Sequence, residues 1–146
     1  MKSDYFSIKE LVCKHVYERY GESAVMFLDD KLIETLNVIR EQILCAPMTV
    51  NNWHAGGNFT QRGLRCNICE LVKNKTDAGK LYLSAHMLGK AVDCNVEGMT
   101  AEEARRLIIA KQELLPYPIR LEDGVSWLHF DLYKNGKNEK VYLFKA

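Results

Sequence analysis

The sequence predicts an α+β fold in which an antiparallel sheet is flanked by helices. Apolar residues recur at helical spacing through the first part of the chain, whereas the last thirty residues read as strands separated by the turn dipeptides Asp123-Gly124 and Asn135-Gly136. The chain has 146 residues, of which 47% are hydrophobic, so it is long enough to bury a core of its own. Because we find no repeat and no linker, we expect a single domain over residues 1–146.

Three long helices are expected where capping residues precede apolar positions spaced three or four apart. Ser7 and Glu10 have the spacing of a capping box before the first helix, and Thr100 and Glu103 repeat it before the third. An aspartate pair at 29–30 can cap the second helix. The expected helices cover about 8–20, 29–46 and 100–115, and a shorter one covers about 66–73.

Strands are expected where short apolar or alternating runs lie between turn residues. These runs cover 48–50, 81–83, 91–93, 119–122, 126–133 and 140–145. A two-residue turn at Asp123-Gly124 would pair Arg120 with Trp127. Period-two alternation then puts five side chains on one face of this hairpin: Arg120, Glu122, Trp127, His129 and Asp131.

Charge and composition argue against several functional classes. Lys and Arg number 20 against 19 Asp and Glu, a net charge of +1, so no nucleic-acid or membrane partner is expected. The start of the chain is polar, and no run of 18 apolar residues occurs. Five scattered cysteines suit reduced thiols. We therefore expect a monomer that is made in the cytoplasm without a signal peptide.

A candidate metal site comes from three residues. His86 and Asp93 lie on either side of Gly89, whose conformational freedom lets the chain turn back and bring both side chains to one point. His129 lies on a predicted strand. Two neutral imidazoles and one carboxylate form a ligand set of catalytic zinc, with the fourth position left open. The alternative is that His129 is an ordinary structural histidine.

The two histidine segments resemble a known family. Ser-x-His-x-x-Gly-x-Ala-x-Asp at 84–93 and Trp-x-His-x-Asp at 127–131 are similar to motifs of the zinc D-Ala-D-Ala carboxypeptidases, which share their fold with hedgehog signalling domains. Residues 5–13 and 36–50 also resemble stretches of that family. The resemblance implies a zinc metallopeptidase of peptidoglycan stem peptides. Both a D-Ala-D-Ala carboxypeptidase and an L-Ala-D-Glu-type endopeptidase fit it, and a phage or prophage product would reach the cell wall after release.

The resemblance also implies roles for individual residues. His86, Asp93 and His129 would hold Zn²⁺. Gly63-Leu64-Arg65 resembles the Ser-Gly-Tyr-Arg motif of the family, so Arg65 would bind the carboxylate of the substrate or stabilise charge on its carbonyl oxygen.

The general base departs from the best-known pattern of the family. Many members carry Glu-x-x-His, but Ser126 stands three residues before His129 and cannot usefully accept a proton. Glu122 lies on the predicted hairpin face, and residues 119–127 resemble a phage-type branch of the family. Glu122 is therefore the candidate base. Without an active base, the same fold would serve as a non-catalytic zinc-binding or wall-binding module.

Four more residues are candidates for supporting roles around this site. We expect Asp131 to accept a hydrogen bond from a metal-bound His129 and Ser84 to support the loop of His86. Trp127 would form a wall of the cleft, and His54 would reach the substrate from a loop. The alternative for Trp127 is a core position, and the alternative for His54 is an ordinary surface histidine.

Cys66 and Cys69 form a Cys-x-x-Cys motif that fits three interpretations. It can be a redox couple, half of a structural zinc site, or two half-buried thiols that pack as small apolar residues. We favour the third interpretation, because the chain has no second Cys-x-x-Cys. His15 falls on the apolar side of the first predicted helix and is expected to be structural.

Overall fold

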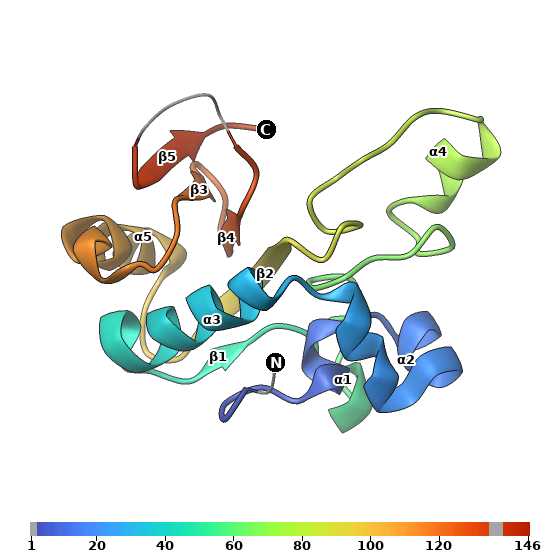
Figure 1. The fold of residues 1–146 in the computed structure, drawn as a ribbon, viewed down its shortest axis with the longest axis horizontal. Helices are drawn as coiled ribbons and strands as arrows, with labels where there is room; N and C mark the ends of the chain where they lie inside the picture. The colour runs from blue at the N-terminus through green and yellow to red at the C-terminus, as the bar shows by residue number, and fades with distance from the viewer. Residues whose placement is uncertain (1–2, 135–138) are drawn as a thin grey trace.

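A five-stranded mixed sheet organises the fold (Figure 1). The computed structural model describes residues 3–134 and 139–146. The strands stand in the order β1-β2-β4-β3-β5, and each neighbouring pair is antiparallel except β3 and β5, which are parallel. Their bounds are β1 (Met48–Thr49), β2 (Ala91–Val96), β3 (Ile119–Glu122), β4 (Leu128–Asp131) and β5 (Val141–Phe144). The α+β class is confirmed, but the antiparallel sheet is wrong.

The error lies in the last strand, which was expected to form a hairpin with β4. β5 instead pairs with β3, where Ile119 lies opposite Val141. The physical reason is that β2 and β3 already occupy the two edges of β4, so only the outer edge of β3 is free. The Asn135-Gly136 turn of the predicted hairpin lies outside the described residues.

The two-residue turn at Asp123-Gly124 is also wrong. A longer connection over 123–127 joins β3 to β4, and the register pairs Arg120 with Asp131 instead of Trp127. The residue opposite Arg120 is therefore four positions further along the chain than predicted. A shift by an even number leaves every side chain on its original face, so the predicted common face is retained.

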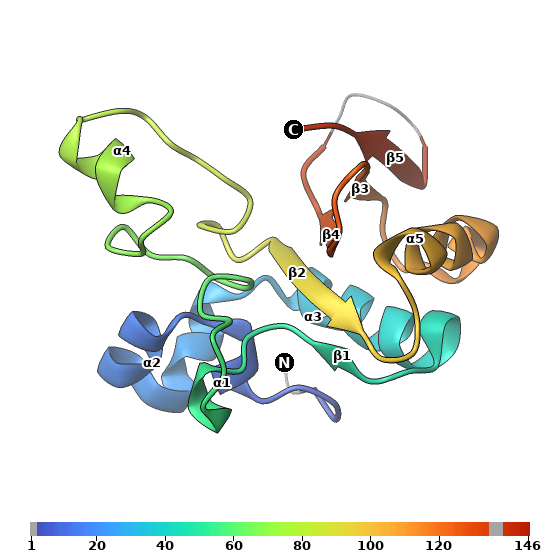
Figure 2. The same cartoon turned by 180° about the vertical axis from the view of Figure 1, so that it is seen from behind.

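Helices lie on one side of the sheet and at its ends. The α-helices are α1 (Ile8–Leu11), α2 (Lys14–Tyr20), α3 (Asp30–Val38), α4 (Lys73–Asp77) and α5 (Ala101–Ala110). The 3₁₀ segments are η1 (Gly21–Phe27), η3 (Trp53–Ala55) and η4 (Gln112–Leu114), and the π-helical η2 (Ile39–Leu44) continues α3. The views from the front and from behind place α3 across one face of β2 (Figures 1 and 2).

The predicted caps of α3 and α5 are confirmed. The Asp29 carboxylate accepts a hydrogen bond from the backbone N–H of Lys31 at 2.9 Å. Thr100 and Glu103 exchange two side-chain-to-backbone hydrogen bonds, each 3.1 Å long. Both helices therefore begin where their capping residues indicate.

Three predicted elements that precede β2 are split or not formed in the structure. The expected helix over 8–20 is split, because Val12 forms a parallel bridge with Leu64 and the N–H of Cys13 donates to the Leu64 carbonyl at 3.0 Å. The expected helix over 66–73 is wrong, since α4 begins at Lys73. The expected strand over 81–83 is not formed.

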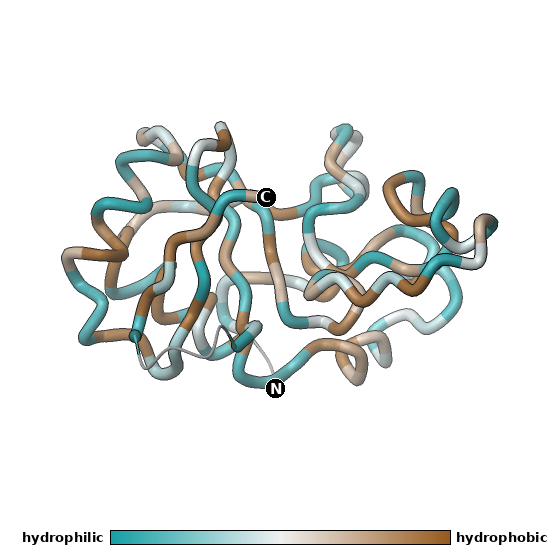
Figure 3. The backbone as a smooth tube through the Cα atoms, turned by 90° about the horizontal axis from the view of Figure 1, so that it is seen from above, coloured by the Kyte–Doolittle hydropathy of each residue, from teal (hydrophilic) through white to brown (hydrophobic). Residues whose placement is uncertain are grey.

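The faces of the central strands differ in polarity. The apolar face is fully buried against the helices, and its side chains are Val92, Cys94, Leu121, Leu128 and Phe130. Figure 3 shows hydrophobic positions recurring along most elements, interleaved with hydrophilic ones, so many elements contribute to one core. Among residues 3–134 and 139–146, no helix has both the length and the apolar character that crossing a membrane requires.

Gly89 is the glycine on which we expect the fold near His86 to depend most. Its φ is +68°, and a Cβ there would overlap the carbonyl oxygen of Phe27. We predict that Gly89→Ala lowers the free energy of unfolding by about 3 kcal/mol or more, since strain and overlap add. Gly98 has a φ of +76° with open space around it, so Gly98→Ala should cost only about 1 kcal/mol. Urea denaturation of both variants measures these losses, and an equal loss of unfolding free energy in the two variants would contradict the prediction.

Candidate functional site

The three predicted metal ligands converge on the polar face of the sheet. Asp93 on β2 lies directly opposite His129 on β4 in the strand register. The left-handed turn at Gly89 brings His86 back beside β2, as the sequence predicted. The ligand atoms of His86, Asp93 and His129 all lie within 4.8 Å of one another, and all three residues are buried.

Each imidazole is oriented by a hydrogen bond on the ring nitrogen that faces away from Asp93. His86 Nδ1 lies 2.9 Å from the Gly63 carbonyl oxygen, which can only accept, so Nδ1–H donates and Nε2 points to Asp93. His129 Nε2 lies 2.8 Å from a carboxylate oxygen of Asp131, which leaves Nδ1 facing Asp93. A carbonyl or carboxylate on the far nitrogen is the usual surrounding of a metal-binding histidine.

Asp131 is itself held in place by a cation. Arg120 on β3 donates two hydrogen bonds to its carboxylate, at 2.8 and 2.9 Å. The Asp131 side chain is fully buried, and a buried carboxylate is stable only when it is paired in this way. The predicted supporting position of Asp131 beside His129 is therefore present, and Arg120 completes it.

Mutual hydrogen bonding shifts the pKa values of this group in opposite directions. Burial alone would raise the pKa of Asp93, but hydrogen bonds from His129 and His86 outweigh it and hold that pKa far below its usual range. Burial alone would lower the pKa of His129, yet the carboxylates of Asp131 and Asp93 raise it to about 9. In the protein without metal, His129 is thus an imidazolium between two carboxylates.

The donor set fits a tetrahedral metal ion. Bonds of about 2.0–2.1 Å place two such ligand atoms about 3.3 Å apart. His86 Nε2 and Asp93 Oδ2 already have this separation, 3.3 Å. His129 Nδ1 and Asp93 Oδ1 lie closer, at 2.7 Å, because they share a proton. Metal binding would displace that proton and leave His129 Nδ1 free to bind the ion beside Asp93 Oδ2.

The three ligands lie in an open pocket of about 380 Å³. Glu122 is one of its lining residues, and its Oε2 lies 4.0 Å from His129 Nδ1. Arg65 also lines the pocket, where its guanidinium contacts an Asp93 oxygen at 3.1 Å. The other predicted residues that line it are Ser84, Trp127 and Asp131. The Ser84 hydroxyl accepts the backbone N–H of His86 at 3.2 Å, which supports that loop.

His54 is the one predicted site residue that the structure places elsewhere. It is exposed on η3, with its ring edge against Trp53, and it is not among the residues that line the pocket. The loop position near Arg65 in the sequence did not translate into a position near the ligands.

Five residues that line the pocket were given no role by the sequence, and three of them have large side chains: Arg120, Tyr133 and Phe144. Arg120 lay on the predicted face, but the assumed two-residue turn paired it with Trp127 and so hid its contact with Asp131. Phe144 reaches the pocket only because β5 runs parallel to β3. Tyr133, whose hydroxyl donates to the Leu83 carbonyl, carried no recognisable signal.

The raised pKa of His129 predicts how the stability of the metal-free protein depends on pH. The folded pKa of about 9 exceeds the ordinary value of about 6.5, so the stabilisation is complete below about pH 6.5 and is lost as pH rises toward 9. We expect chelator-treated protein to lose up to about 3 kcal/mol of unfolding free energy across this range. His129→Gln should lose less. Urea denaturation at several pH values measures this dependence. If the unfolding free energy fell equally with pH in both proteins, the assignment to His129 would be refuted.

Comparisons with models of protein families, with curated proteins and with solved structures found no match.

Proposed function

We propose that this protein is a zinc metallopeptidase that hydrolyses peptide bonds in peptidoglycan stem peptides, with the hedgehog/DD-peptidase fold and as a monomer. The observation that supports this most is the convergence of His86, Asp93 and His129 within one open pocket. Two imidazole nitrogens and a carboxylate oxygen are typical ligands of catalytic zinc. A zinc ion bound there supplies Lewis acidity and lowers the pKa of water.

Glu122 is the proposed general base. Its carboxylate lies 4.0 Å from His129 Nδ1, close to the ligands without being one of them. Glu122 Oε2 would take the proton of the attacking water and pass it to the leaving amine nitrogen as the C–N bond breaks. Asp131 would hold His129 in the orientation that keeps Nδ1 directed into the pocket.

Arg65 is the proposed contact for the negative charge of the substrate. Its Nε donates to the Gln61 carbonyl at 2.6 Å, which fixes the guanidinium at the pocket wall beside Asp93. There it would bind the substrate's carboxylate or stabilise charge on the carbonyl oxygen. Both D-Ala-D-Ala and L-Ala-D-Glu-type bonds fit this chemistry, and the motif resemblance is what favours peptidoglycan over other peptides.

Metal analysis tests the ligand assignment. We predict that His86→Ala and His129→Ala each contain one zinc equivalent per chain less than the wild type, because each removes one of three protein ligands. His54→Ala is the matched control, since it removes an exposed histidine outside the pocket, and it should keep the wild-type content. Unchanged zinc in both ligand variants, measured by elemental analysis, would exclude this site.

Substitution of the base tests turnover. We predict that Glu122→Gln keeps its zinc but releases peptide from cell-wall fragments about 10²–10⁴-fold more slowly, because the amide cannot accept a proton. Peptide release is measured by chromatography of digested wall preparations.

A non-catalytic module is the second candidate, and Ser126 in place of the glutamate of Glu-x-x-His favours it. Wild-type protein that binds zinc at His86 and His129 but releases nothing from several wall types would support that module and refute the peptidase.

A further inference from the structure

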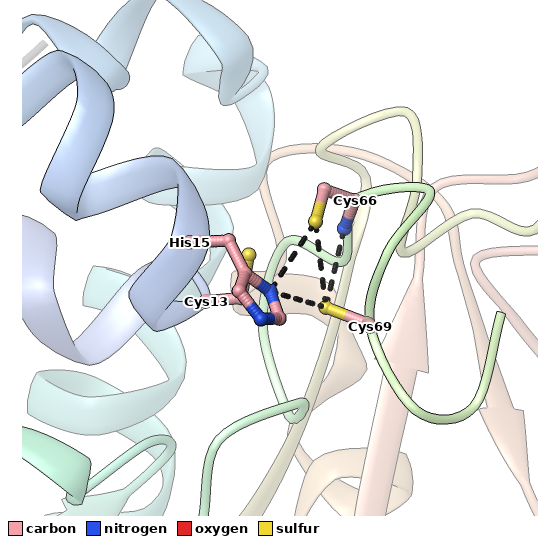
Figure 4. Close-up of side chains that lie close together, drawn as sticks. All are labelled: Cys13, His15, Cys66 and Cys69. Carbon is pink, nitrogen blue, oxygen red and sulfur yellow. Dashed lines mark hydrogen bonds between the residues drawn. The ribbon is translucent and has the colours of Figure 1, made fainter. Parts of the chain in front are cut away.

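A second cluster of metal-ligating side chains lies outside the pocket. Cys13 and His15 come from the start of α2, whereas Cys66 and Cys69 come from the loop after Arg65 (Figure 4). Their ligand atoms all lie within 4.8 Å of one another, although more than fifty residues separate the two pairs. The expected position of His15 on an apolar helix face is not what the structure shows. Its ring is exposed, and Nδ1 faces two thiols.

The spacing of three of these four ligand atoms matches tetrahedral zinc, and the fourth, Cys13 Sγ, lies within 4.8 Å of each of them. With Zn–S bonds of about 2.3 Å and Zn–N bonds of about 2.0–2.1 Å, two sulfurs lie about 3.8 Å apart and a sulfur and a nitrogen about 3.5 Å apart. The Cys66 and Cys69 Sγ atoms are 3.7 Å apart. His15 Nδ1 lies 3.5 Å from Cys66 Sγ and 3.8 Å from Cys69 Sγ. Hydrogen bonds between pairs of these atoms do not require the three separations to be similar. Coordination of all three atoms to one central ion does require it.

The surroundings also suit a closed structural site. Cys13 and Cys69 are each 1% exposed, and the backbone N–H of Cys66 points at Cys69 Sγ at 3.4 Å, as donors around metal thiolates do. Four protein donors fill a tetrahedral shell and leave no position for substrate, in contrast to the three donors of the pocket.

The segment that carries Cys66 and Cys69 packs on a small apolar cluster. Residues 66–90 contain one short α-helix, α4, and the part of this segment around α4 projects from the body of the molecule (Figures 1 and 2). The apolar cluster beneath them has only three buried members: Cys13, Cys69 and Val72. So small a cluster contributes little burial, and a metal tie is a common solution where the local core is small.

We propose that Cys13, His15, Cys66 and Cys69 bind a second, structural zinc ion that ties the 66–90 loop to α2. Binding would release the three thiol protons to solvent and oxidise nothing, and neutral His15 would coordinate through Nδ1. Because Arg65 directly precedes Cys66, the same tie would position the guanidinium that lies against Asp93.

Cobalt substitution separates this site from the pocket in the wild-type chain. The pocket offers only nitrogen and oxygen, so thiolate-to-cobalt charge-transfer absorption in the near ultraviolet can come only from a site with cysteine ligands. We expect this absorption in Co²⁺-loaded protein, together with the ligand-field bands of tetrahedral cobalt. It should persist in His86→Ala, so a failure of the proposed peptidase site leaves this result unaffected. Its absence from the wild type would overturn the proposal.

Ligand substitutions test the individual residues by metal content and melting temperature. Cys69→Ser and His15→Ala should each lose one zinc equivalent and melt about 10 °C or more below the wild type. Cys45→Ser is the matched control, because Cys45 is exposed and outside the cluster, and it should keep both values. His15→Cys should keep the zinc, since a thiolate can replace the imidazole, whereas a merely structural histidine would not be rescued in this way.

Two outcomes would reject the zinc site even if a variant failed to fold. One is wild-type zinc content in His15→Ala, where only an exposed side chain has changed. The other is a Cys66–Cys69 disulfide in protein purified without reductant and supplied with zinc, detected by mass spectrometry, which would identify the pair as a redox couple.

Discussion

A row of alternating charges across the polar face of the sheet holds the site together. It runs from Arg120 to Asp131, His129, Asp93 and Arg65, each in hydrogen-bond contact with the next. Most of these groups are buried, and an isolated buried charge would be far too costly to maintain. The row therefore depends on the register of three strands and on the 62–65 segment. Loss of any member would leave its neighbours with uncompensated charge.

The rest of the architecture keeps this face open and rigid. Alternation along β2, β3 and β4 directs apolar side chains into the helix-covered core and leaves the ligands opposite. Arg105 of α5 is buried and donates to the carbonyls of Val125 and Trp127 at 3.1 and 3.2 Å. These bonds brace the connection between β3 and β4, which carries Trp127 to the pocket wall. A helix on the far side of the sheet thus shapes the mouth of the pocket.

The capping and glycine signals in the sequence were reliable, whereas the Asp123-Gly124 turn signal and the pairing of the last strand were not. The caps at Asp29 and Thr100, and the turn at Gly89 that brings His86 to Asp93, act over a few residues and were predicted. The parallel pairing of β5 was missed, because it depends on which strand edges other segments have already taken. The Cys13–His15–Cys66–Cys69 cluster was missed for a similar reason, since no spacing rule links a helix start to a Cys-x-x-Cys fifty residues later.

The segment over 62–65 carries a constraint on chain length. A side chain at Gly63 would overlap the Leu11 carbonyl, the Gly63 carbonyl holds His86, and Leu64 bridges Val12. Arg65 alone then separates this clamped backbone from Cys66. An insertion of even one residue here would move the Cys13–His15–Cys66–Cys69 cluster relative to the ligands of the pocket. The exposed tip at Gly79-Lys80, in contrast, lies in a loop that can accommodate added residues. Homologous chains should therefore vary in length at the tip and keep a constant count between Gly63 and Cys66.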